Sequence, residues 1–163
     1  MPKYGSPWRS SPAEMPQPEV LQELGRRLLA APDCAPDCAQ LPRLRLEAAG
    51  GVLRARLEVH TAAAAAIPLP GAGQAWSPSS VLLDGAPAPG LRREPDGTVW
   101  LPVSAGVHQV LLEGPLPDAE LVPLPLPLKP RRVEASVSGW TIHGLREDGR
   151  ADDSLQLARV RNA

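Results

Sequence analysis

Apolar and polar residues alternate one by one along the chain from about residue 41 onward. In the stretches 44–48 and 53–59, leucine, alanine or valine fills every second position, and arginine or glutamate fills the positions between. Such alternation is typical of antiparallel strands with one face on the core and the other in water. Between the two stretches, Gly50 and Gly51 predict a tight hairpin turn.

Further short stretches, separated by turn residues, are also expected to form strands. They are 80–83, 98–103, 107–113, 119–128, 132–137, 140–145 and 154–160. Asp-Gly pairs at 84–85, 96–97 and 148–149 mark turns, because glycine adopts positive φ freely and aspartate tolerates it. The pattern therefore predicts an all-β fold, a single antiparallel β-sandwich of Ig-like or jelly-roll-like type over residues 41–163, with about eight or nine strands.

Before residue 41 the apolar spacing becomes helical. One stripe of apolar residues follows Pro18, which suits a first helical position; the stripe is Val20, Leu21, Leu24, Leu28 and Leu29. Pro32 ends the helix, and a helix this short is marginal in isolation, so we expect it to pack on the sandwich. Residues 17–40 are thus assigned to a helix and a cysteine-containing loop, and residues 1–16 to a flexible tail or linker.

The segment 122–130 alternates leucine with proline. Pro123, Pro125 and Pro127 are two residues apart, so in a strand their missing N–H donors all lie along one edge. Such an edge resists pairing with another strand, which predicts an edge strand or a bridge between sheets. Polyproline II is the alternative, but its period of three residues fits the alternation less well.

Composition excludes several classes of protein. The net charge is −1, with two lysines and fifteen arginines, so the sequence gives no strong field for nucleic acid or an anionic membrane. No apolar run approaches the roughly 18 residues of a membrane span. The 21 prolines and 14 glycines are many, but fewer than in low-complexity chains.

The two cysteines, Cys34 and Cys38, lie in a duplicated Ala-Pro-Asp-Cys phrase. A turn at Pro36 would bring them close enough for a disulfide, which would imply an oxidising compartment. The alternative is two unlinked thiols in a loop. The CxxxC spacing argues against a redox-active pair.

Catalytic and metal-binding motifs are not evident. The chain has no GxSxG elbow, P-loop or HExxH pattern, and it is expected to be neither an enzyme nor a binder of a cofactor or metal. His108 shares parity with apolar positions and is expected to point inward, whereas His60 and His143 are expected on the surface. The acidic segment 147–154 is better explained by a solvated hairpin turn than by a calcium loop, because it lacks the DxDxDG arrangement.

Tryptophans are the main aromatic residues of the sandwich. Trp140 has the parity of core residues. Trp100 has outward parity and Trp76 lies in a Gly/Pro/Ser loop, so these two are possible stacking surfaces for sugar rings. The alternative is core packing in place of the absent phenylalanines.

The polar faces of the two neighbouring strands carry arginines 43, 45, 54 and 56. Cross-strand charge pairing is the simplest explanation for them, and a basic patch is the alternative.

Residues 81–114 contain a phrase of strands and turns that resembles a known kind of module. A strand ends in Asp-Gly, a second hairpin follows with Asp-Gly-Thr-Val-Trp-Leu, and a Gly-x-His strand closes the phrase. This phrase is similar to β-sandwich modules of large uncharacterised bacterial cell-envelope proteins. The resemblance implies a non-catalytic module and an extracytoplasmic setting, and it assigns no functional residues.

Taken together, the sequence predicts a structural or interaction module of a larger bacterial envelope protein. Its partners would be other domains of a larger chain or another envelope protein, and neither nucleic acid nor direct membrane insertion is expected. The alternative is a carbohydrate-binding module that uses Trp76 and Trp100. Residues 1–16 lack the pattern of a secretory signal, which indicates either a cytosolic protein or a segment of a longer exported chain; the resemblance favours the periplasmic or extracellular side of the envelope.

Overall fold

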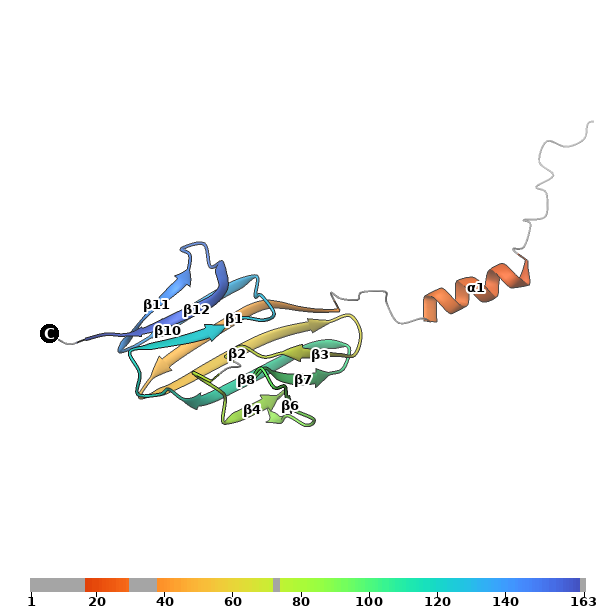
Figure 1. Cartoon of the computed structure of the whole chain (residues 1–163). Helices are drawn as coiled ribbons and strands as arrows, with labels where there is room; N and C mark the ends of the chain where they lie inside the picture. The colour runs from red at the N-terminus through yellow and green to blue at the C-terminus, as the bar shows by residue number, and fades with distance from the viewer. Residues whose placement is uncertain (1–16, 30–37, 72–73, 162–163) are drawn as a thin grey trace, which may run out of the picture. The chain divides into compact units, whose positions relative to one another are not determined.

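A computed structural model describes residues 17–29, 38–71 and 74–161 (Figure 1). The chain divides between Pro32 and Asp33 into two compact units. The first contains the predicted helix, α1 (Pro18–Leu29). Its apolar residues Val20, Leu21 and Leu24 are 50–55 % exposed, and the packing of this helix on the sandwich stays a prediction.

The second unit is all β, as predicted. Its strands are β1 (Ala39–Ala49), β2 (Val52–Thr61), β3 (Ala65–Pro68), β4 (Ser80–Leu83), β5 (Ala86–Pro87), β6 (Arg92–Arg93), β7 (Val99–Val103), β8 (Gly106–Pro115), β9 (Leu121–Pro125), β10 (Arg132–Val137), β11 (Trp140–Leu145) and β12 (Ala151–Arg159). The short strands β3, β5 and β6 were not predicted, because β5 and β6 have only two residues each and β3 follows a run of alanines without alternation of apolar and polar positions.

These strands form one large sheet and two small ones (Figure 1). The large sheet has the order β10-β1-β2-β8-β4-β5, and the small sheets have the orders β11-β12-β9 and β3-β7-β6. The β1–β2 hairpin closes at Gly50 and Gly51, as predicted, and their φ angles of 60° and 78° lie in the left-handed region that favours glycine.

One pairing differs from the predicted antiparallel arrangement, since β1 and β10 run parallel. Parallel neighbours need a long connection, and here most of the sandwich lies between the two strands in sequence. Alternation along a strand reveals which face is buried but not the direction of the neighbour, so the sequence could not show this pairing.

The inward faces of all three sheets share one hydrophobic cluster. From the large sheet it includes Leu44, Leu46 and Leu57, each at most 1 % exposed. Leu101 of β7 and Leu155 of β12 are fully buried members from the two small sheets. Arginine and glutamate occupy the alternate positions of β1 and β2, so the predicted inner and outer faces are confirmed.

The first part of the leucine-proline segment forms an edge strand, as predicted, but the strand ends at Pro125 and Pro127 lies beyond it. β9 lies at the edge of its sheet, beside β12. Just beyond the strand, Leu126 N donates to Asp153 O at 2.9 Å, so the donors of the alternate, non-proline positions face β12. Pro123 and Pro125 therefore place their missing donors along the outer edge, where an additional strand would need them.

Candidate functional site

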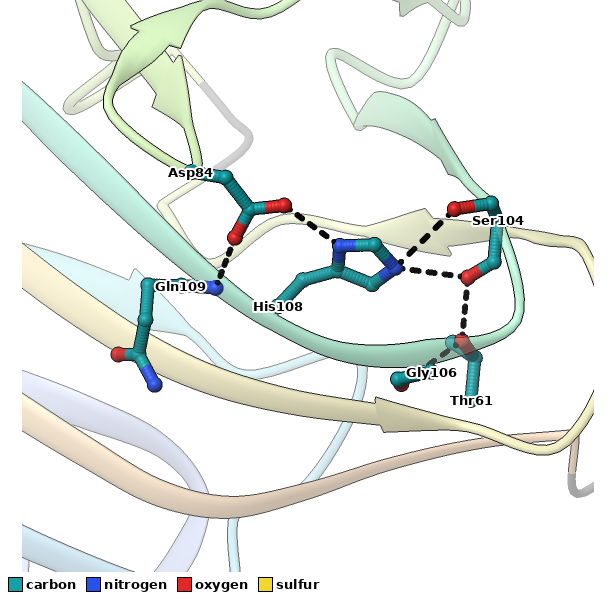
Figure 2. A network of polar contacts seen from close by, with 6 residues as sticks. All are labelled: Thr61, Asp84, Ser104, Gly106, His108 and Gln109. Carbon is teal, nitrogen blue, oxygen red and sulfur yellow. Dashed lines mark hydrogen bonds and ion pairs between the residues drawn. The ribbon is translucent and has the colours of Figure 1, made fainter.

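A polar network joins the β4–β5 turn to the loop between β7 and β8 (Figure 2). Asp84 Oδ2 lies 2.7 Å from His108 Nδ1, and His108 Nε2 lies 2.8 Å from the backbone oxygen of Ser104. The Ser104 hydroxyl oxygen is 3.4 Å from the same Nε2. Carboxylate, imidazole and serine are the side chains of a hydrolytic triad, so their geometry decides whether they can act as one.

The turn that carries Asp84 is held by the strand beside it. Asp84 has a φ of 51° and Gly85 one of 85°, which gives the tight turn expected for this Asp-Gly pair. Asp84 N donates to Gln109 O, and Gln109 N donates back to Asp84 Oδ1, both at 2.8 Å. The carboxylate thus has a fixed place beside β8.

The loop that carries Ser104 is held from the other side. Thr61 is a buried polar residue at the end of β2, and its hydroxyl donates to Ser104 O at 2.6 Å (Figure 2). The Ser104 carbonyl oxygen therefore accepts hydrogen bonds from both Thr61 and His108.

The acceptors around His108 determine its protonation state. A carboxylate and a backbone carbonyl can only accept hydrogen bonds, so both imidazole nitrogens must donate for both contacts to form. The geometry therefore describes an imidazolium ion. In agreement, hydrogen bonds to Asp84 and to the Ser104 carbonyl raise the pKa of His108. The hydrogen bonds from His108 and from the Gln109 amide lower the pKa of Asp84.

This arrangement does not match a hydrolytic triad. In a triad the distal imidazole nitrogen must accept the proton of the serine hydroxyl, and so must carry a lone pair. In this network, Nε2 lies 2.8 Å from the Ser104 carbonyl oxygen and directs its proton there, so it presents no lone pair to the Ser104 hydroxyl oxygen, which is 3.4 Å away. The network is suited to holding two loops together.

Sequence reasoning found the parts of this network separately. The predicted inward parity of His108 agrees with its side chain, which is 12 % exposed. Asp84 was recognised only as a turn residue, and Ser104 was not singled out. The missing signal was the β4–β8 pairing, which brings residues 24 positions apart into contact.

The other histidines and the acidic segment show no site of this kind. His60 Nε2 lies 2.9 Å from Glu58 on the outer face of the sandwich, and His143 is exposed, as predicted. The acidic segment forms the predicted turn between β11 and β12, where Arg146 pairs with Asp152 at 3.5 Å. In the part of the chain that the structure describes, no three or more His, Cys, Asp or Glu side chains gather so as to hold a metal ion.

Trp76 is a core residue, which corrects its prediction as a possible sugar-stacking surface. Its side chain is 3 % exposed, and its indole Nε1 donates to Gly114 O at 3.2 Å. Gly71 lies so close that a Cβ there would overlap the indole ring. The loop around Trp76 folds inward because the ring is more stable buried with its single donor satisfied than in water.

Trp100 and Trp140 agree better with their predictions. Trp100 is half-buried and lines a depression of about 270 Å³, together with Arg92 and Pro102. Trp140 is 6 % exposed, as its core parity predicted, and the Arg159 guanidinium lies 4.5 Å from its ring centroid.

The outer face of the large sheet carries the four arginines predicted to pair across strands. Arg54 contacts Glu113 at 3.1 Å and Glu47 at 4.0 Å. Glu134 of β10 is shared by Arg45 at 3.3 Å and Arg43 at 3.9 Å. Charge pairing is therefore confirmed for three of the four, and Arg56 is the exception.

Three further observations concern the disulfide, a membrane span and the comparisons with known proteins. Cys34 lies outside the described residues, so the Cys34–Cys38 disulfide stays a prediction. Within 17–29, 38–71 and 74–161, no helix is both long and apolar enough to cross a membrane. No protein-family model and no curated protein matches the chain.

Proposed function

We propose that the chain is a non-catalytic structural and interaction module of a larger bacterial envelope protein. The observation that carries the proposal is the use of Asp84, Ser104 and His108. These side chains come nearest to a catalytic group in the described residues, and their hydrogen bonds join two loops instead of leaving a base and a nucleophile available.

The exposed surface supports a role in binding. The outer face of the large sheet presents charged side chains on β1, β2 and β8, while the outer edge of β9 carries prolines that hinder strand addition. A module of this kind would contact its neighbours through side chains on a sheet face rather than by joining another strand at that edge.

A serine-reactive fluorophosphonate probe tests the non-catalytic part of the proposal. The intact chain should be labelled no more than a Ser104→Ala variant, because no lone pair on His108 activates the hydroxyl. Labelling at Ser104 that disappears in both Ser104→Ala and His108→Ala would overturn it.

The envelope setting rests on the resemblance of residues 81–114, which run from β4 through β8, and on the predicted disulfide. The disulfide is tested by measuring the mass of the non-reduced protein after it has been exported from the cytoplasm. The proposal expects the mass to be lower by two hydrogens than after reduction, and two free thiols would count against an oxidising compartment.

A second candidate function is carbohydrate binding through Trp100. The specific observation that favours it is the depression of about 270 Å³ that this ring lines beside Arg92. Titration of tryptophan fluorescence with a panel of neutral polysaccharides tests it, with Trp100→Ala as control. A shift that the variant abolishes would support this candidate, and an unchanged spectrum would exclude it.

A further inference from the structure

The outer face of the large sheet has an unusual distribution of charge around Arg56. Arg56 lies directly opposite Arg45 of β1 in the antiparallel register and directly opposite Leu111 of β8 on its other side. Like charges directly opposite each other destabilise a sheet, and leucine offers no compensation. Among the described residues, Arg56 forms no ion pair or side-chain hydrogen bond, whereas Arg45 is paired with Glu134.

The nearest carboxylate on the same strand does not compensate Arg56. Glu58 is two residues further along β2 and on the same face, but its Oε1 lies 2.9 Å from His60 Nε2. Arg43, which faces Glu58 in the register, contacts Glu134 instead. Glu134 thus serves three arginines, Arg43, Arg45 and Arg132, and the exposed Arg56 is not among them.

Two depressions meet at Arg56. The first, which we call the arginine groove, has a volume of about 280 Å³ and is lined by Arg43, Arg45, Arg56, Glu58 and Gln109. The second, the leucine shelf, has a volume of about 380 Å³ and adds Leu82, Gly85, Val110 and Leu111 to the shared residues Arg56 and Gln109. A cationic groove and an apolar shelf therefore lie side by side, with a guanidinium and an amide between them.

We propose that this surface binds a saccharide that contains uronic acid. Its carboxylate would lie on Arg56, whose guanidinium offers paired donors, and the anion would relieve the repulsion from Arg45, which is itself paired with Glu134. The C–H face of the sugar ring would cover Leu82 and Leu111. Gln109, which can both donate and accept, would bind ring hydroxyls.

The backbone of the sheet favours a saccharide over an acidic peptide. Arg56 lies in β2, which is paired on both sides, so its backbone N–H and C=O groups are committed to β1 and β8. An extended peptide gains much of its affinity from main-chain hydrogen bonds at a free sheet edge, which this face does not provide. A saccharide needs only side-chain partners, because its hydroxyls are both donors and acceptors.

The site is distinct from the tryptophan depression. The arginine groove and the leucine shelf have no aromatic lining residue, so stacking, which suits neutral sugars, is not the mode of binding here. Charge supplies the recognition instead, and affinity should fall with added salt. This inference depends on the proposed function in one respect, that the chain is a module that binds other molecules.

Isothermal titration calorimetry of the intact chain with trigalacturonate tests the proposal. Arg56→Gln should weaken binding about tenfold, the loss expected for one charge-assisted hydrogen bond. Arg54→Gln is the matched control, since Arg54 lies on the same strand and face but already pairs with Glu113; its effect should be about twofold or less. Thermal unfolding of both variants shows that they are folded.

Three further probes define the chemistry. The methyl ester of trigalacturonate should not bind, because it lacks the carboxylates, and triglutamate should bind about tenfold more weakly, because it lacks the hydroxyls and ring face. Inorganic sulfate should compete only weakly. Equal binding of trigalacturonate to wild type and Arg56→Gln, no binding at all, or equal affinity for triglutamate would each overturn the proposal. These binding results do not affect the labelling of Ser104. The proposed non-catalytic function is therefore tested independently of the saccharide site.

Discussion

The two faces of the large sheet differ in how completely their side chains are satisfied. On the inner face, Leu53, Leu57 and Val59 of β2 are at most 1 % exposed and belong to the common core. On the outer face, neighbouring residues of the same strand hold charges at 3–4 Å from their partners, and Arg56 has none among the described residues. Adjacent positions of one strand therefore differ in their surroundings, since the inner ones close the core and the outer ones present charge to solvent.

Leu57 and Arg56 allow the most direct test of this division. Leu57→Ala should lower the free energy of unfolding by about 2–5 kcal/mol, because it leaves a cavity in the closed core. Arg56→Gln should change it by about 0.5 kcal/mol or less, since an exposed charge without a partner contributes little. Urea denaturation of both variants gives the comparison, and equal effects would contradict the separation of the two faces.

Gly71 extends the comparison to the loop that covers the core. Gly71→Ala should destabilise the sandwich by about 2–4 kcal/mol, because φ is 76° and the new Cβ would overlap the Trp76 ring. Gly50→Ala is the control: its φ is 60° but the space around it is open, so only the backbone cost of about 1 kcal/mol is expected. A Gly71 variant no worse than the Gly50 variant would show that Trp76 is not held in place as described.

The Asp84–His108 pair is expected to make a smaller contribution to the free energy of unfolding, and this contribution depends on pH. The pKa of His108 is raised on folding, so its stabilisation is complete below the unfolded pKa of about 6.5 and is lost as pH rises through the folded value. The pKa of Asp84 is lowered, so its contribution is lost only as pH falls through the folded value, below about 3.8.

His108→Gln should therefore cost about 1 kcal/mol near pH 5, and distinctly less near pH 9. Urea denaturation at the two pH values measures the difference. The exposed His143, replaced by Gln, is the control and should have little effect at either pH. A cost for His108→Gln that is the same at both values would show that the imidazolium is not the stabilising form.

Local patterns in the sequence predicted individual strands and turns of the sandwich. Alternation in 44–48 and 53–59 identified the buried faces of β1 and β2, the Gly50–Gly51 pair identified their turn, and the spacing of Pro123 and Pro125 identified an edge strand. Each of these features depends on residues close together in the chain, where the period and the glycine or proline geometry are sufficient.

The features that sequence reasoning missed depend on distant residues. The parallel β1–β10 pair, the contact of Asp84 with His108, and the burial of Trp76 under Gly71 all require knowledge of which strands and loops are neighbours. For Arg56, the residue type predicted charge pairing. Only the register showed Arg45 on one side and Leu111 on the other.

Nuclear magnetic resonance of the intact chain, titrated with trigalacturonate, tests the binding role of the outer face most directly. The signals of Arg56 Nε and the Gln109 side-chain amide should shift, while the indole Nε1 signals of Trp76 and Trp100 should stay in place. Shifts confined to the Trp100 indole, with the Arg56 and Gln109 signals unchanged, would contradict the account and direct attention to the tryptophan depression.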